Sequence, residues 1–205
     1  MGLFFANDAV DLQPVSPPLG VHLNHTAQKP TTLVLKESVF SWTGDNFSVK
    51  DTEGHTVVKC SGKAVSFRDR KEISDAHGNF MFAIRNKLIA IHKTFVGEDK
   101  EGNDLFKISK KWGVGSHMVA TFKNASNGQD TTLVLRGDFW GGSADIKVDN
   151  GPVVAQITRK VFNAREYFGD KQTYMVNVAP GVDLALIAAV CICFDEAKNE
   201  NEDKD

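Results

Sequence analysis

The chain has 205 residues, of which 41% are hydrophobic and 24% are charged, and its formal net charge is -2 at pH 7. This length and composition are typical of one globular domain that buries a sizeable core. Because the net charge is close to zero, binding of a polyanion such as nucleic acid through bulk charge is excluded.

Residues 1–30 are the first predicted segment, an irregular N-terminal arm. The segment contains four of the six prolines and shows no apolar periodicity, so no regular element is expected in it. Its first ten residues lack a basic stretch followed by a sustained apolar one, which is the pattern of a secretory signal. We therefore expect a cytoplasmic protein.

A glycine beside a polar, turn-forming residue recurs along the segment that follows. Gly54, Gly78 and Gly102 are 24 residues apart, and Gly128 and Gly151 follow after 26 and 23 residues. Glycine and asparagine accept the positive φ angles of tight hairpin turns. Each repeat therefore predicts one β-hairpin.

Between these turns apolar residues alternate with polar ones, which is typical of strands with one buried and one solvent-facing side. The clearest examples are residues 47–50, 106–109, 118–122, 144–149 and 174–178. Further turns connect one hairpin to the next, at residues 43–45, 68–70, 113–115, 141–142 and 169–170. About a dozen antiparallel strands result, and they must stack as a sandwich or close into a barrel.

The longest stretch without a polar side chain is Leu184 to Phe194. Its alanines favour a helix over a strand, and a helix of about 16 Å is too short to cross a bilayer. A helix that is apolar on every face must be covered on all sides. A sandwich offers no such place, whereas a barrel of about twelve strands has an interior that its own side chains do not fill.

We therefore predict a mainly β fold. Residues 31–194 form a closed antiparallel barrel of about twelve strands around a buried hydrophobic C-terminal helix at residues 182–194. An acidic tail at residues 195–205 follows the helix, since it holds six acidic residues and two lysines.

Four segments carry a resemblance to a known family: Asn46–Gly54, Ile157–Lys160, Gly169–Asp170 and Tyr174–Ala188. In these segments the chain resembles the LURP-one-related (LOR) family, whose fold is similar to the C-terminal domain of tubby proteins and to phospholipid scramblases. The resemblance extends from Phe40 to Glu196. It implies a tubby C-terminal-like barrel around a central helix, in agreement with the patterns above, and it implies no catalytic residues.

Patterns for catalysis, metals and cofactors are absent from the sequence. The acidic turns at residues 51–54 and 99–102 lack the ligand spacing of a calcium loop. His22 and His25 are close in the chain, but two imidazoles without further ligands hold a metal weakly. The three cysteines are an odd number, and we expect Cys191 and Cys193, which lie inside the apolar stretch, to be buried thiols. We predict a protein that is not an enzyme and that has no cofactor and no metal site.

Basic residues gather at the expected strand ends, where the rim of a barrel would bring them together. The likeness to tubby implies that such a rim binds phosphoinositide headgroups through charge-assisted hydrogen bonds to phosphate. The candidate phosphate- or lipid-binding residues are Arg68, Arg70, Lys71, Lys107, Lys110, Lys111, Arg159 and Lys160. Ordinary solvated charge is the alternative, since acidic residues are interspersed among them.

Two functions remain open from the sequence. The first is a non-catalytic module that binds phosphoinositides or anionic membrane surfaces peripherally. The second is a soluble protein-interaction or scaffold domain with a protein partner and no lipid affinity. Nucleic-acid binding is disfavoured because no basic stripe with interleaved aromatic residues is present. We expect a monomer without a transmembrane segment.

Overall fold

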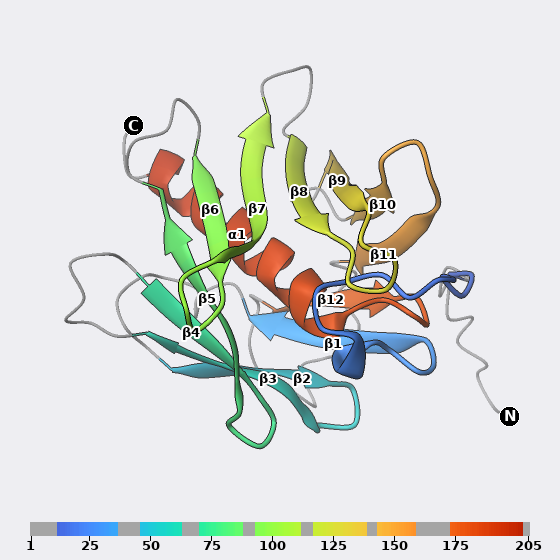
Figure 1. Ribbon diagram of the computed structural model, residues 1–205, viewed down its shortest axis with the longest axis horizontal. Coiled ribbons are helices and arrows are strands. Elements are labelled where there is room, and N and C mark those ends of the chain that lie inside the picture. Colours follow the sequence, from blue (N-terminus) through green and yellow to red (C-terminus); the bar gives the residue numbers. More distant parts are fainter. Residues whose placement is uncertain are drawn as a thin grey trace, which may run out of the picture.

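The computed structural model describes residues 12–36, 46–62, 70–87, 93–111, 117–138, 143–158 and 173–202. Within these residues, twelve antiparallel strands form one closed barrel (Figure 1). The strands are β1 (Thr31–Lys36), β2 (Phe47–Asp51), β3 (Thr56–Gly62), β4 (Arg70–Asp75), β5 (Phe80–Asn86), β6 (Thr94–Glu98), β7 (Asp104–Lys111), β8 (His117–Lys123), β9 (Asp130–Asp138), β10 (Ser143–Val148), β11 (Val153–Thr158) and β12 (Thr173–Val178). The predicted mainly β barrel is confirmed.

Consecutive strands are neighbours all the way round, and β1 closes the barrel by pairing with both β2 and β12. Leu33 of β1 lies opposite Val176 on one side and opposite Asp51 on the other. Because the sheet closes on itself, it presents no long unpaired edge. Five predicted connections, at residues 43–45, 68–69, 113–115, 141–142 and 169–170, lie outside the described residues.

The alternation of the sequence decides which side of each strand faces the interior. In β12 the side chains of Tyr174, Val176 and Val178 are buried, while the residues between them are partly exposed. The same alternation puts Val49 of β2 inside and leaves its neighbour Lys50 in solvent. The period of two therefore predicted the inner face of these strands correctly.

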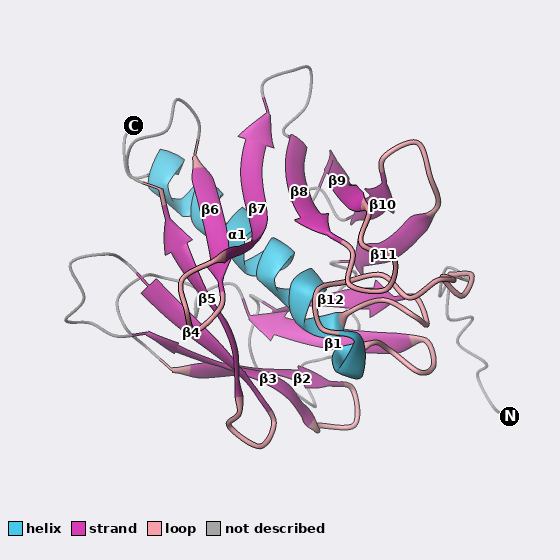
Figure 2. Ribbon diagram, viewed as in Figure 1, coloured by secondary structure: helices cyan, strands magenta, loops and turns pink. Residues whose placement is uncertain are grey.

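The helix α1 (Leu184–Glu202) lies inside the barrel, where Figure 2 shows it running between the strands. Every residue from Ala185 to Ala197 is at most 7% exposed. The apolar side chains of this segment share one core with the inward-facing residues of the strands. The predicted buried central helix is therefore confirmed.

Both predicted ends of the helix differ from the observed ones. The helix begins at Leu184 rather than Val182, because the Asp183 carboxylate accepts hydrogen bonds from the main-chain N–H groups of Ala185 and Leu186 and so caps it. It also continues eight residues beyond Phe194, into the predicted acidic tail. No glycine or proline interrupts this segment, and helix formers dominate it.

The first turn of the acidic segment is buried rather than solvated. Asp195 and Glu196 are 1% and 5% exposed. The Tyr174 hydroxyl donates a 2.8 Å hydrogen bond to Oδ2 of Asp195. A buried carboxylate needs such partners, because an uncompensated charge is costly in an apolar interior. The segment that follows Phe194 is thus part of the core at its beginning.

The N-terminal arm packs against one end of the barrel. Its one described helical turn, η1 (Leu23–His25), is a short 3-10 helix. Single bridges join Leu19 to Val182 and Thr26 to Asp183. The arm buries apolar side chains of its own, since Leu19 is 5% exposed. The described part of the arm, residues 12–30, therefore packs on the barrel and contributes to its core.

None of the described helices combines the length and the apolar character that are needed to cross a bilayer.

We expect the substitution Ile187→Asp to abolish cooperative folding. Ile187 is fully buried in α1, and an unpaired buried carboxylate costs several kcal/mol out of the roughly 5–15 kcal/mol available to a domain. The matched change Ile187→Val keeps the site apolar and should cost only about 1 kcal/mol. Thermal unfolding of the purified variants measures both. An unchanged transition in Ile187→Asp, or in a chain truncated after Pro180, contradicts the central position of the helix.

Candidate functional site

The antiparallel order gives the barrel two chemically different ends. The turns after β2, β4, β6, β8 and β10 lie at one end, together with the start of α1, and we call this the turn end. The connections after β1, β3, β5, β7, β9 and β11 lie at the other end, which we call the loop end. The loop-end connections fall largely outside the described residues, so the local geometry of the turn end is known in more detail.

Three turns at the turn end share one construction, in residues 51–55, 75–79 and 99–103. In each, Oδ1 of the first-position aspartate accepts a hydrogen bond from the main-chain N–H of the fifth residue, at 2.7–2.8 Å. The fourth residue is a glycine with φ between 86° and 91°, a conformation that side chains with a Cβ disfavour. The predicted hairpins with this spacing are confirmed, and their aspartates have a structural role.

Asp183 is the most heavily used carboxylate of the turn end. It is fully buried, and its Oδ1 accepts the two helix-capping hydrogen bonds from Ala185 and Leu186. Its Oδ2 accepts hydrogen bonds from the main-chain N–H groups of Val21 and His22, at 3.1 and 2.8 Å. Burial raises the pKa of the Asp183 carboxyl, and the four N–H donors oppose this rise. One side chain therefore holds the arm to the start of the helix.

Asn124 gives the arm a second anchor, from the turn after β8. Its Oδ1 accepts from the Gly20 N–H at 3.1 Å, and its Nδ2 donates to the Pro18 carbonyl oxygen at 3.2 Å. The fit is close, because a Cβ on Gly20 would lie 2.1 Å from the Cβ of Asp183. The arm is therefore fixed in position on both sides of Gly20.

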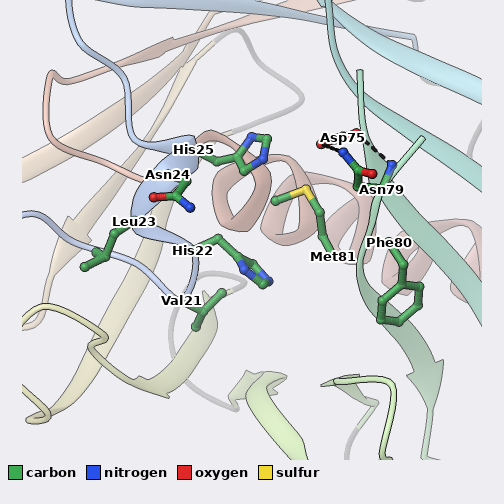
Figure 3. A pocket seen from close by; sticks show the side chains of 9 residues that line it. All are labelled: Val21, His22, Leu23, Asn24, His25, Asp75, Asn79, Phe80 and Met81. Carbon is green, nitrogen blue, oxygen red and sulfur yellow. Dashed lines mark hydrogen bonds between the residues drawn. The ribbon is translucent and has the colours of Figure 1, made fainter. Parts of the chain in front are cut away.

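A pocket of about 360 Å³ lies between the arm and the β4–β5 hairpin (Figure 3). Its arm side is formed by residues 21–25 and its hairpin side by Asp75 and residues 79–81. The volume is at the lower end of the range of about 300–1,000 Å³ for small-molecule sites. The two histidines that the sequence singled out as a weak metal pair, His22 and His25, both line this pocket.

The His22 ring is held between the arm and the barrel. It stacks on the Phe82 ring, with 5.8 Å between centroids and 17° between planes. Its Nε2 is shielded from solvent and has no hydrogen-bond partner among the described residues. Burial lowers the pKa of His22, and a contact with the Met81 main chain only partly opposes this. The imidazole is therefore neutral at neutral pH.

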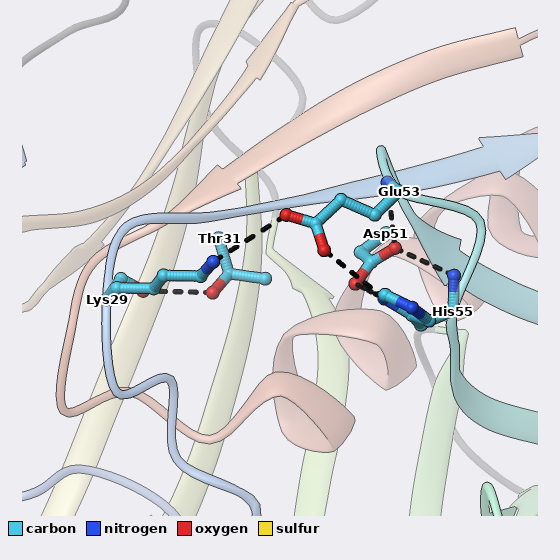
Figure 4. A network of polar contacts seen from close by, with 5 residues as sticks. All are labelled: Lys29, Thr31, Asp51, Glu53 and His55. Carbon is cyan, nitrogen blue, oxygen red and sulfur yellow. Dashed lines mark hydrogen bonds and ion pairs between the residues drawn. The ribbon is translucent and has the colours of Figure 1, made fainter.

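Among the described residues, one group has three potential metal-ligating side chains close together: Asp51, Glu53 and His55 (Figure 4). Their ligand atoms all lie within 4.8 Å of one another. The His55 Nδ1 lies 3.3 Å from the Asp51 Oδ2 and 3.4 Å from the Glu53 Oε2. The Lys29 Nζ lies 3.7 Å from the Glu53 Oε1. These contacts explain why the three side chains lie together, since all belong to the turn of residues 51–55. The predicted absence of a metal site stays a prediction.

The predicted basic rim is described only in part. Arg68, Arg159 and Lys160 lie outside the described residues, and of Lys111 only the backbone is described. Arg70 and Lys71 begin β4 at the loop end, and Lys110 and Lys111 end β7 at the same end. Lys107 is exposed on the outer wall of β7, three residues before Lys110. The fold thus brings the strand ends that carry the predicted residues to one end of the barrel.

Lys71 does not lie on the outer surface. It is 2% exposed, because the alternation of β4 turns Lys71, Ile73 and Asp75 inward. Its Nζ lies 5.6 Å from the centre of the Phe47 ring. A side chain this deeply buried does not offer its charge to a membrane surface in this structure, which separates Lys71 from Arg70, Lys107 and Lys110.

All three cysteines are buried, Cys191 and Cys193 as predicted and Cys60 in addition. Burial raises the pKa of Cys60 to about 12, and the neighbouring Lys71 ammonium only partly opposes this. Burial also raises the pKa of Cys191 and of Cys193. A thiol with such a pKa is a poor nucleophile at neutral pH. All three are free cysteines.

Arg85 was not among the residues predicted from the sequence, and it lies directly opposite Arg70 in the β4–β5 ladder. Two like charges in this position repel each other. The Arg85 Nε forms an ion pair with Glu98, and its NH2 group lies 3.7 Å from Asp104, so acidic neighbours offset the repulsion. The signal was present, since Arg85 follows five apolar residues and therefore stands near the end of a strand.

Comparisons with known proteins agree with this architecture. A family model described as LURP-one-related matches residues 31–195. The protein LURP-one-related 12 of Arabidopsis thaliana is 26% identical over 179 residues, covering 84% of this chain and 80% of its own length. LURP-one-related 15 of the same plant is 22% identical over 184 residues, covering 86% of this chain and 84% of its own length. LURP-one-related 14 is 26% identical over 175 residues, covering 83% of this chain and 86% of its own length.

A crystal structure of a protein from Arabidopsis thaliana superposes with a TM-score of 0.60. It shares 17% sequence identity and covers 86% of this chain and 96% of its own chain, a similarity that shows the fold alone. The molecule is thus a closed β-barrel filled by its C-terminal helix. It belongs to the LURP-one-related family. These comparisons do not show the similarity to phospholipid scramblases that the sequence led us to expect.

We expect Asp183→Ala to release the arm and destabilise the fold by about 2–4 kcal/mol, because it removes a helix cap and leaves buried N–H donors without an acceptor. Asp183→Asn keeps one acceptor oxygen and should cost less. Hydrogen exchange at the Val21 and His22 amides, combined with urea unfolding, measures both effects. The exposed Asp130→Ala is the control. Unchanged exchange at both amides in Asp183→Ala contradicts the anchoring role.

The turn carboxylates should make the fold sensitive to acid. Hydrogen bonds from the side-chain amides of Asn79 and Asn103 hold the pKa of Asp75 and of Asp99 below the usual range. A carboxyl whose pKa is lower in the folded state than in the unfolded state stabilises the fold at any pH above its unfolded-state pKa of about 3.9. This stabilisation is lost as the pH falls through the folded-state pKa. The urea concentration at the midpoint of unfolding should therefore decrease when the pH is lowered below about 4.

The variant Asp99→Asn tests this acid sensitivity, because it removes one of these titrating groups and keeps an acceptor oxygen. Its urea midpoint should depend less on pH below about pH 4 than that of the unmodified chain. Asp130→Asn removes an exposed carboxylate from the following hairpin and serves as the control. An equal pH dependence in Asp99→Asn and in the unmodified chain contradicts the assignment.

Proposed function

We propose that this chain is a non-catalytic LURP-one-related protein that binds anionic membrane surfaces peripherally, with the loop end of the barrel facing the lipid. Phosphoinositide headgroups are the ligands that the tubby-like resemblance favours. Such lipids are concentrated on the cytoplasmic leaflet, so the proposal includes a cytoplasmic location.

One observation carries the proposal: strands far apart in the chain present basic residues at the same end of the barrel. Arg70 opens β4 and Lys110 lies next to the end of β7. By sequence, Arg68 precedes β4 by two residues, and Arg159 and Lys160 directly follow β11. Basic side chains near a negatively charged surface contribute about 1 kcal/mol each.

Lys71 is left out of the membrane-contacting set, because its side chain is buried within the barrel. The proposed set is Arg68, Arg70, Lys107, Lys110, Lys111, Arg159 and Lys160. The absence of an enzymatic role is part of the proposal. It is supported by the buried thiols and by the structural use of the turn aspartates, and the names of the matching relatives describe no reaction.

Liposome co-sedimentation tests the proposal. The double substitution of Arg70 and Lys110 by alanine should weaken binding to phosphoinositide vesicles by about 2 kcal/mol, or roughly 30-fold. Raising the salt concentration from about 0.1 M to about 1 M should have a similar effect, because the Debye length falls from about 10 to about 3 Å. Phosphatidylcholine vesicles give the uncharged reference.

The matched control replaces Lys29 and Lys123, which lie at the turn end with side chains 76% and 71% exposed. It removes the same net charge and should leave vesicle binding unchanged. Equal losses in both double variants, or binding that does not respond to salt, contradict the proposed orientation. If the unmodified chain does not sediment with anionic vesicles at all, the soluble protein-interaction function replaces this proposal.

A further inference from the structure

The pocket between the arm and the β4–β5 hairpin has no part in the proposed membrane contact, because it lies at the turn end of the barrel. Both of its sides are fixed. The arm side is held by the Asp183 hydrogen bonds to Val21 and His22. The hairpin side is held by the Asp75 turn, in which Oδ1 accepts from the N–H groups of His77 and Asn79, both at 2.8 Å. A pocket with walls fixed in this way binds a ligand without first ordering itself.

The polar groups of the pocket indicate the charge of its ligand. Among the described residues that line it, one carries a carboxylate, Asp75, and none is a lysine or an arginine. Hydrogen bonds hold the pKa of Asp75 low, so the carboxylate is ionised at neutral pH. Its Oδ2 accepts one described hydrogen bond, from the Asn79 Nδ2 at 2.7 Å, and a carboxylate oxygen has room for a second. An anionic ligand would meet repulsion here, and a cationic ligand would gain a charge-assisted hydrogen bond.

The remaining lining groups indicate the shape of the ligand. Figure 3 shows the rings of His22 and His25 and the side chain of Met81 around the space beside Asp75. Flat imidazole rings and a polarizable thioether suit a planar ligand. The buried His22 Nε2 adds a polar group without a partner among the described residues.

The chain itself places a cation against one of the lining residues. The Lys100 Nζ lies 5.7 Å from the centre of the Phe80 ring, a cation–π contact at the margin of the pocket. Lys100 is exposed and belongs to the turn between β6 and β7. In Figure 3 the Phe80 ring points away from Asp75.

We propose that the pocket binds a small, planar organic cation of the amidinium or aromatic ammonium type. The cationic group donates to Oδ2 of Asp75, and the flat part of the ligand lies against the imidazole rings of His22 and His25. This ligand site goes beyond the proposed membrane function and does not depend on it.

Benzamidine, a planar cation, and benzoate, an anion of nearly the same shape, are the probes. Each is titrated into the full chain while the ring signals of His22 and His25 are followed by NMR. Benzamidine should shift both signals to saturation, and benzoate should not. Equal shifts with benzoate, or no shift with benzamidine up to about 10 mM, overturn the proposal.

The chain provides a matched pair of variants. Asp75→Asn removes the charge that faces the pocket, whereas Asp99→Asn makes the same change in a turn of the same construction that does not line it. Asp75→Asn should weaken benzamidine binding about tenfold, the loss expected for one charge-assisted hydrogen bond, and Asp99→Asn should leave it unchanged. Equal losses in the two variants overturn the proposal.

A second pair covers the case in which Asp75→Asn does not fold. His25→Lys introduces an ammonium group on the arm side of the pocket, and Gln28→Lys adds the same charge to an exposed arm residue that does not line it. Benzamidine binding should be lost in the first variant and kept in the second. Retained affinity in His25→Lys overturns the proposal. Neither variant should change vesicle binding, so the outcome is separate from that of the membrane test.

Discussion

The structure depends on the buried carboxylate of Asp183. A carboxyl group in an apolar interior is tolerated only when hydrogen bonds replace its lost hydration, and here four main-chain N–H groups donate to it. Two of the donors belong to the start of α1 and two to the arm. The same side chain therefore fixes where the central helix begins and holds the arm across the end of the barrel. Helix, arm and barrel form one unit through this group.

The two ends of the barrel carry different side chains among the described residues. At the turn end, tight hairpins use aspartates as internal hydrogen-bond acceptors, and the arm forms main-chain hydrogen bonds to residues 180–183 and to Ala125. At the loop end, basic residues begin or end strands, and the helix arrives with the carboxylates of Asp195 and Glu196 buried inside the wall. The described strand ends therefore differ in chemistry between the two ends of the barrel.

Local signals explain what the sequence predicted correctly. The period-two alternation and the turns with an aspartate three residues before a glycine depend on neighbours within a few residues, so they indicated the strands directly. The run from Leu184 to Phe194 then favoured a closed barrel over a sandwich. The sequence placed Lys71 on the rim, although Lys71 lies two residues before Ile73 and therefore on the same inward face of β4. Applying the alternation to every residue of that strand would have placed it inside.

Long-range contacts explain what the sequence did not show. Asn124 holds Gly20, 104 residues away, and no local pattern in the arm indicates this partner. The burial of Asp195 depends on the Tyr174 hydroxyl, so the charge of the segment after Phe194 was a poor guide to its environment. The cap formed by Asp183 was also missed, although its signal is local, because an aspartate directly before an apolar helical run is a recognisable N-cap. Its second role, as the acceptor for the arm, becomes visible only in the folded chain.

The central helix follows every described strand in the chain, and this order has a consequence for biosynthesis. A ribosome produces the wall of the barrel before it produces the segment that fills it. Until α1 leaves the exit tunnel, the inward-facing side chains of the nascent sheet have no apolar partner to cover them. Domains usually fold as complete units during translation. Here an element made after all of the described strands completes the core, so the nascent chain must keep a half-finished sheet soluble until the helix has emerged.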